Sequence, residues 1–313
     1  MGFNALNSKV RGSVAQLHDQ FVNAQPFRHL IIDDLLDASL FQSLVDQFPA
    51  FETKNAINEF GEAGGKAVRA DLPQLGPGYA RFDTLMQDRS FLAWLSQLTG
   101  IPKLLYDPAY VGGGTHENIS GQGLDPHVDF NYHTNGSWHR RLNLILFLND
   151  RWEPDWGGCL QLHRNPWLPP SEDETQTVVP RANRAVIFET TENSWHGFPR
   201  IVLPTEAGEI TRRTVAVYFY TTERPAADTV PEHGTYYVPR PFPEYVAAGQ
   251  PLEKAQVNEL RELFERRNQQ IRYLWESERE LREQLQRIDR SASVRLARAL
   301  TWPLRKVRDA LRG

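Results

Sequence analysis

The chain has very little cysteine and no long apolar run, and each absence excludes a class of protein. Cys159 is the only cysteine among 313 residues, so an intrachain disulfide framework is excluded, which fits a reducing compartment. No stretch of about 18 consecutive apolar residues occurs, so we expect no membrane-spanning helix. Residues 1–6 have no apolar signal core, and Leu6 breaks the myristoylation pattern, so we expect a cytoplasmic protein.

An excess of positive charge is also absent. The formal net charge is −4, so no overall electrostatic attraction to nucleic acid is expected. Hydrophobic residues make up 40% of the chain and aromatic residues 11%, which is enough for a substantial core. The length allows either one large domain with an appendage or two domains.

The N-terminal part of the chain has the texture of helices around one short strand. Apolar residues at helical spacing predict helices over 4–24, 37–48 and 82–99, and a β-rich run predicts a strand over 27–32. The polar, glycine-containing segment 50–73 is interpreted as a long loop close to a site.

From about residue 104 the pattern changes to short apolar or alternating runs between Gly, Pro and Asn clusters. Many short strands with regular turn signals are typical of an all-β sandwich or barrel. We therefore expect an α+β fold, in which a double-stranded β-helix (jelly roll) with flanking N-terminal helices fills residues 1–245. The expected strands cover 108–119, 124–132, 139–148, 157–163, 177–180, 184–189, 196–203 and 210–222.

A long C-terminal helical arm is predicted after a proline-rich hinge at 238–243. Over 251–290 the apolar residues follow a heptad that is broken only by Arg267 and Glu278. This pattern favours a homodimer formed through a coiled coil, and the alternative is a helix packed on its own jelly roll. The apolar heptad residues are Val257, Leu260, Phe264, Ile271, Leu274, Leu281, Leu285 and Ile288.

The last segment, 291–313, completes a C-terminal helical region that spans 251–313. It is a second helical stretch, rich in arginine, with apolar residues between the charges. Such a basic amphipathic tail predicts a peripheral contact with an anionic membrane or with a protein partner, and the alternative is a merely solvated face. The tail resembles those of bacterial enzymes of surface-polysaccharide assembly.

The central chemical signal is His127-x-Asp129, in a predicted strand where positions two apart share a face. With 9 His and 39 acidic residues among 313, about one His-x-acid pair is expected by chance, and one is present. A third ligand on a facing strand would complete the two-His-one-carboxylate set of non-heme Fe(II) oxygenases. His196, which follows the strand 185–189, is the best candidate.

A second signal lies in the strand 210–222. Alternation there places Arg212, Thr214, Ala216 and Tyr218 on one face and the intervening apolar residues on the other. An arginine inside a barrel requires an anion, and a guanidinium can bind a carboxylate through two parallel hydrogen bonds. Strand phase selects Arg212 for this role, with the adjacent Arg213 as the alternative.

The order of these residues resembles that of the Fe(II)/2-oxoglutarate-dependent dioxygenases, and most closely the prolyl 4-hydroxylase-like branch. The pattern is His-x-Asp, a returning His, and then Arg-x-Thr on the next strand. Four further stretches, at 27–36, 110–116, 141–149 and 156–160, are similar to segments of that branch. The resemblance covers about residues 25–225.

The resemblance implies a site and its cofactors. His127, Asp129 and His196 would bind Fe(II), and Arg212 would hold the distal carboxylate of 2-oxoglutarate. Thr214 would assist Arg212. Asn143 lies on the central strand, where relatives place polar contacts to 2-oxoglutarate. O₂ would be the other co-substrate, and ascorbate an additional reductant.

The implied function is the hydroxylation of an aliphatic carbon in a peptidyl or small-molecule substrate, coupled to decarboxylation of 2-oxoglutarate to succinate. A prolyl residue is the first expectation. The C-terminal tail favours an alternative, a hydroxylase of a sugar or surface-polysaccharide precursor. A non-enzymatic alternative is a metal- or ligand-sensing scaffold that is dimerised by the C-terminal arm. Fold and branch alone do not decide among these substrates.

Overall fold

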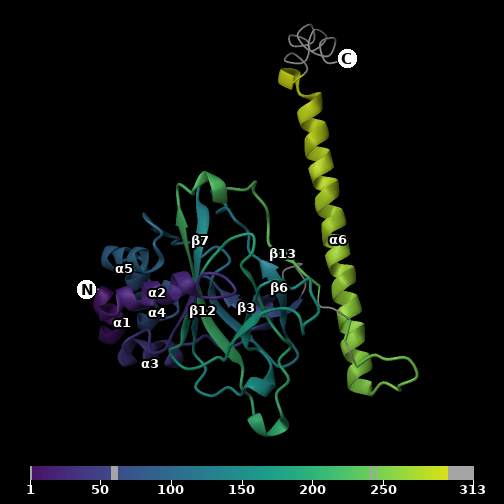
Figure 1. Ribbon diagram of the computed structural model, residues 1–313, viewed down its shortest axis with the longest axis horizontal. Coiled ribbons are helices and arrows are strands. Elements are labelled where there is room, and N and C mark those ends of the chain that lie inside the picture. The colour runs from purple at the N-terminus through teal and green to yellow at the C-terminus, as the bar shows by residue number, and fades with distance from the viewer. Residues whose placement is uncertain (1, 58–62, 240–241, 244, 295–313) are drawn as a thin grey trace. The chain divides into compact units, whose positions relative to one another are not determined.

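A computed structural model describes residues 2–57, 63–239, 242–243 and 245–294 (Figure 1). The chain divides into two compact units, Met1–Pro243 and Glu244–Gly313. The first unit contains all of the β-sheet in the described residues, and the second contains one long helix.

Two antiparallel sheets form the centre of the first unit. In the described residues, the larger sheet has eight strands in the order β1-β10-β7-β12-β5-β3-β2, with β4 paired to β12. The smaller sheet has five strands in the order β13-β6-β11-β8-β9. The larger sheet comprises β1 (His29–Ile32), β2 (Ala56–Ile57), β3 (Ala63–Arg69), β4 (Leu105–Tyr106), β5 (Gly114–Asn118), β7 (His139–Phe147), β10 (Ala185–Glu189) and β12 (Arg212–Thr221). The smaller sheet comprises β6 (Leu124–Val128), β8 (Leu160–His163), β9 (Thr175–Val178), β11 (Trp195–Phe198) and β13 (Tyr236–Tyr237).

The N-terminal helices are shorter and more numerous than the sequence pattern predicts. The helix predicted over 4–24 is divided at Ser13, which has non-helical backbone angles. The helix predicted over 82–99 is divided at Asp88, whose side chain accepts a hydrogen bond from the Ser90 amide and so starts a new helix. The helices are η1 (Gly2–Ala5), α1 (Ser8–Gly12), α2 (Val14–Asn23), α3 (Ala38–Asp46), α4 (Pro77–Met86) and α5 (Arg89–Thr99). Short 3₁₀ turns occur at η2 (Thr53–Asn55), η3 (Leu72–Gln74), η4 (Pro154–Trp156), η5 (Thr205–Ala207) and η6 (Ala226–Asp228).

Two apolar layers hold these elements together. The helices cover one face of the larger sheet (Figure 1). The β12 residues in the apolar cluster shared with these helices are Val215, Val217 and Phe219. On the other face, Phe147 and Phe188 of the larger sheet pack against Leu162 and its neighbours in the smaller sheet. The polar alternate residues of β12 therefore face the space between the sheets, as the period-two pattern predicts.

The segment 50–73 is not the loop that its polar sequence predicts. It contains β2, β3 and η3, and β3 extends the larger sheet by pairing with β5, with Ala67 opposite Glu117. The sequence Ala-Gly-Gly-Lys-Ala-Val-Arg has low intrinsic strand propensity. Hydrogen bonding to the distant β5 therefore determines this strand, and a local pattern could not reveal it.

The second unit is built on α6 (Lys254–Arg290), a helix of 37 residues, which agrees with the predicted arm. It begins with a capping box, in which the side chains of Glu253 and Gln256 each accept from the other residue's backbone amide. Most of the basic tail predicted over 291–313 lies outside the described residues. In the part of the chain that the structure covers, no helix is long and apolar enough to cross a membrane.

Candidate active site

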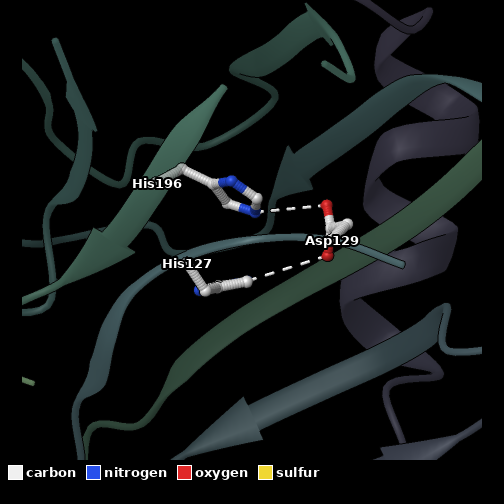
Figure 2. A group of neighbouring side chains, drawn as sticks. All are labelled: His127, Asp129 and His196. Atoms are coloured by element: carbon white, nitrogen blue, oxygen red, sulfur yellow. Dashed lines mark ion pairs between the residues drawn. The ribbon is translucent and has the colours of Figure 1, made fainter. Parts of the chain in front are cut away.

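The residues predicted as metal ligands lie together between the two sheets (Figure 2). His127 of β6 and His196 of β11 are direct cross-strand partners, and Asp129 follows the end of β6. The Nε2 atoms of His127 and His196 lie 3.7 Å and 3.5 Å from the Asp129 carboxylate oxygens. One ligand atom from each residue lies within 4.8 Å of the others, which is close enough for one ion to contact all three.

Both imidazoles are oriented by the backbone. The Nδ1 atom of His127 lies 2.9 Å from the carbonyl oxygen of Asp125, and that of His196 lies 2.9 Å from the carbonyl oxygen of Ser194. A carbonyl accepts hydrogen bonds, so each Nδ1 carries the proton and each Nε2 keeps its lone pair. This arrangement fixes the tautomer in which a histidine binds a metal ion through Nε2.

The electrostatics of the three side chains favour a cation. Burial lowers the pKa of His127 to about 3 and also lowers the pKa of His196, so both rings are neutral at pH 7. Burial acts to raise the pKa of Asp129, but Arg140, the two histidines and Asn143 outweigh it and lower that pKa. The set therefore presents two neutral nitrogens and one carboxylate, which suits a divalent transition metal.

The Asp129 carboxylate is held by two residues of β7. The Asn143 amide nitrogen donates to Asp129 Oδ2 over 2.7 Å, and Arg140 Nη2 lies 3.1 Å from the same oxygen. Arg140 also donates from Nε and Nη2 to Asn143 Oδ1 over 3.0 and 2.9 Å. Its guanidinium lies over the ring of Tyr218 at 3.5 Å. The two residues thus form a clamp that orients the Asp129 carboxylate.

Asn143 was predicted to contact 2-oxoglutarate, and that contact stays a prediction. The residue lines the same cavity as the three ligand candidates, but its described hydrogen bonds go to Asp129 and Arg140. Arg140 lines the same cavity, although it was not among the predicted site residues. Only 1% of Arg140 is exposed, and it pairs with the candidate ligand Asp129.

Arg212 and Thr214 of β12 line the same cavity, which has a volume of about 280 Å³. Arg212 Nε donates to the Gly158 carbonyl oxygen over 2.7 Å, and its guanidinium lies 4.2 Å from the centre of the Phe198 ring. Burial lowers the pKa of Arg212 to about 10. In the part of the chain that the structure covers, no carboxylate forms an ion pair with this buried guanidinium, so an anionic ligand would complete the site.

Arg213, the alternative to Arg212, lies on the opposite face of β12. Its Nε is 3.1 Å from Glu117 Oε1, and 41% of its side chain is exposed. It does not line the cavity, whereas Arg212 does. The alternation of a regular strand therefore separates the two adjacent arginines.

Several cavity residues were not predicted as part of the site. Lys66 comes from β3, and His116 and Asn118 come from β5. Tyr237 of β13 also lines the cavity, with its ring centre 5.1 Å from that of His127. The aromatic pair at 236–237 was a weak local signal for a strand, whereas Lys66 had none because its strand was not recognised.

The residues present fit both an iron ion and 2-oxoglutarate. His127, Asp129 and His196 provide three ligands on one side of an open cavity, which leaves further coordination positions free for other ligands. Arg212 provides a buried cation without a carboxylate partner among the described residues, and the hydroxyl-bearing Thr214 is on the same strand face.

Part of the chain is similar to known proteins. Residues 114–220 match the family model described as the 2OG-Fe(II) oxygenase superfamily. A search of curated proteins gave no match. Similar solved structures include a prolyl hydroxylase from Trichoplax adhaerens in complex with a hypoxia-inducible-factor peptide. It is 14% identical over 68% of this chain and 90% of that chain, with a TM-score of 0.46.

Two further similar structures come from other organisms. A prolyl 4-hydroxylase from Phytophthora capsici is 16% identical over 83% of this chain and 75% of that chain, with a TM-score of 0.47. HygX from Streptomyces hygroscopicus, with nickel and 2-oxoglutarate bound, is 15% identical over 70% and 88%, with a TM-score of 0.43. The segment that matches the family model contains the candidate iron ligands and Arg212, so residues 114–220 are identified as a 2OG-Fe(II) oxygenase segment, the part of the chain expected to carry the dioxygenase chemistry.

Proposed function

We propose that this enzyme hydroxylates an aliphatic carbon in a reaction that depends on Fe(II) and 2-oxoglutarate. One observation carries the proposal. The open His127-Asp129-His196 group and the buried Arg212 line a single cavity between the two sheets. A metal-binding set alone would also fit a sensing scaffold, but a buried guanidinium in the same cavity favours a carboxylate co-substrate beside the metal.

Each side chain has a distinct task in this proposal. His127, Asp129 and His196 would hold the iron, which together with 2-oxoglutarate and O₂ would supply the oxidising chemistry. Arg212 binds the distal carboxylate of 2-oxoglutarate, and the Thr214 hydroxyl donates a further hydrogen bond to it. Arg140 and Asn143 keep the Asp129 carboxylate in place while ligands exchange.

Apolar side chains in the cavity limit the access of water to the reacting carbon. Leu124, Ile145, Leu160 and Phe198 line the cavity together with the polar groups. Exclusion of water strengthens the electrostatic interactions inside the site and protects reactive species from side reactions.

A prolyl side chain is the first substrate that we propose, because the motif order resembles the prolyl 4-hydroxylase-like branch. Two of the similar structures are also prolyl hydroxylases, but at 14% and 16% sequence identity their substrates are not evidence for the substrate of this chain. A sugar or surface-polysaccharide precursor is the alternative outcome. A mass increase of about 16 Da on proline-containing peptides or on sugar nucleotides would distinguish the two, since one oxygen atom is added.

The test of the proposed function is the formation of succinate from 2-oxoglutarate. Wild-type protein should require added Fe(II) and O₂, and His196→Ala should abolish the product. His139→Gln is the matched control, because His139 lies on β7 outside the cavity. A wild-type protein that forms no succinate with any candidate substrate would leave the sensing scaffold as the better explanation. The cytoplasmic location stays part of this proposal and requires cell fractionation.

A further inference from the structure

The long helix α6 carries a stripe of large apolar side chains that face solvent. These side chains are each more than half exposed, although residues of this kind are normally buried in a soluble chain. They are Phe264 (67%), Ile271 (63%), Leu274 (51%), Leu281 (56%), Leu285 (62%) and Ile288 (56%). A stripe of this length requires a partner of similar length, such as another helix.

The stripe belongs to a seven-residue repeat that runs over almost five heptads, from Val257 to Ile288, and is interrupted only at Arg267 and Glu278. Coiled coils are identified by about three to four sustained heptads, so this repeat exceeds the usual requirement. The first core position of the heptad is occupied by Val257, Phe264, Ile271, Glu278 and Leu285. The second core position is occupied by Leu260, Arg267, Leu274, Leu281 and Ile288. Each set thus contains one charged residue, and the two charges have opposite sign.

The positions of these two charges discriminate between the orientations of a helix pair. In a parallel pair in register, each core residue faces its own copy, so Arg267 would face Arg267 and Glu278 would face Glu278. Like charges in a partly buried seam are unfavourable, because desolvation strengthens their repulsion. In an antiparallel pair the two chain directions are opposed, and a first core position faces a second core position of the partner.

We infer that α6 pairs antiparallel with α6 of a second copy of this chain, with Arg267 of each copy facing Glu278 of the other. In this register Ile271 of each helix lies opposite Leu274 of the other at the centre of the pair. Two Arg267–Glu278 pairs then form, one on each side of the centre. The same register matches every remaining core residue with an apolar one. The outer pairs are Phe264 with Leu281, Leu260 with Leu285, and Val257 with Ile288.

The residues beside the seam are compatible with this register. On one flank, the heptad positions that meet each other are uncharged: Gln256, Leu263, Gln270, Ser277 and Gln284. On the other flank, Arg261 approaches Arg282 of the partner. Arg282 already pairs with Glu278 of its own helix at 2.6 Å, which offsets that repulsion. Glu278 would then bridge an arginine from each helix.

A charge-reversal series on the full-length chain tests the orientation. Arg267→Glu alone and Glu278→Arg alone each create like-charge pairs in the antiparallel seam, and we expect dimerisation at least about tenfold weaker. The double variant restores opposite charges and should restore the dimer. In a parallel pair, every member of the series contains the same number of like-charge pairs, so the single variants would not differ from wild type.

Sedimentation velocity over a range of protein concentrations measures the dimer. Wild type should sediment as a species of twice 35.9 kDa, and the helical content of each variant, checked by circular dichroism, should be unchanged. A wild-type monomer at all concentrations would overturn the inference and would favour a helix that covers another surface. Equal dimerisation of all four proteins would overturn the antiparallel orientation.

A distance measurement provides an independent readout. Cys159 is buried, so a spin label on Gln284→Cys can be introduced selectively. At a rise of about 1.5 Å per residue, the proposed register separates the two labels by about 35 Å along the helix axis. A parallel pair would place them side by side. A distribution centred below about 20 Å would therefore contradict the proposed register.

Discussion

Replacing Arg212 with methionine should abolish tight binding of 2-oxoglutarate, whereas the same replacement at Arg213 should not. The two residues are adjacent on β12 but face opposite sides of the sheet. Arg212 is 4% exposed and lines the cavity, and Arg213 pairs with Glu117. The pair is therefore a matched test in which residue type and substitution are the same and only the strand face differs.

The expected magnitude follows from the burial of Arg212. Removing one partner of a buried, hydrogen-bonded charge pair costs about 2–5 kcal/mol of binding free energy. Because about 1.4 kcal/mol corresponds to a factor of ten, the Kd for 2-oxoglutarate should rise by about thirty-fold to several thousand-fold. Arg213→Met should change this Kd by less than about twofold, since an exposed charge outside the cavity contributes little.

For protein stability, Arg213→Met should be the more harmful of the two replacements. Without 2-oxoglutarate, Arg212 is a buried cation with one hydrogen bond to the Gly158 carbonyl, so Arg212→Met removes a desolvated charge along with that bond. These effects oppose each other, and the melting temperature should change little. Arg213→Met leaves the buried carboxylate of Glu117 without its arginine and should lower the melting temperature.

An anaerobic titration of Fe(II)-loaded protein with 2-oxoglutarate measures these affinities. The chelate gives a metal-to-ligand absorption band in the visible range, and competition with a chelator checks that Fe(II) binding is unchanged. If Arg212→Met binds 2-oxoglutarate as tightly as wild type, the proposed role of Arg212 is wrong. If Arg213→Met is the variant that loses affinity, the assignment of the strand faces is wrong.

Three further predictions follow from individual contacts. Asn143→Leu removes the amide that donates to Asp129, and chelator competition should show Fe(II) affinity about 10- to 100-fold weaker; an unchanged affinity would contradict the clamp. Burial holds the pKa of His116 well below 6.5, so only the unfolded chain takes up this proton as the pH falls below about 7. The free energy of unfolding should therefore decrease by up to about 1.4 kcal/mol per pH unit from this residue, and urea denaturation of His116→Gln should show a shallower pH dependence. Gly157 has φ of +70°, and an added Cβ would lie 1.9 Å from the Arg200 carbonyl oxygen. Gly157→Ala should thus lower stability by about 1–3 kcal/mol, which a shift in the urea midpoint would reveal.

Most of the strands in the jelly-roll region could be predicted, because their side chains alternate between two different environments. On β12, Val215 and Val217 face the helices while Arg212 and Thr214 face the cavity, so the period of two is visible in the sequence. The heptad of α6 was visible for a similar reason, since one side of that helix is apolar except at Arg267 and Glu278. Local periodicity succeeds where a single element has two chemically distinct faces.

Long-range pairing was not visible in the same way. β3 has a glycine-rich sequence without alternation, and its hydrogen bonds to β5 connect residues about fifty positions apart, such as Ala67 and Glu117. Lys66 lies on this strand and lines the cavity. Its role could not be predicted, because no local pattern specifies which distant strand edge accepts a segment.

The contact between Arg140 and Asp129 could not be predicted because β7 contains a β-bulge. The register of β7 against β12 shifts between Leu142, opposite Phe219, and Arg140, opposite Tyr220, so one extra residue of β7 lies between these two pairs. A bulge changes the alternation of side chains by one position. Arg140 and Asn143 are three residues apart and would lie on opposite faces of a regular strand, yet both reach Asp129. The irregularity therefore has a chemical consequence, since it brings a cation and an amide to the same Asp129 carboxylate, an arrangement that a period-two analysis of the sequence excludes.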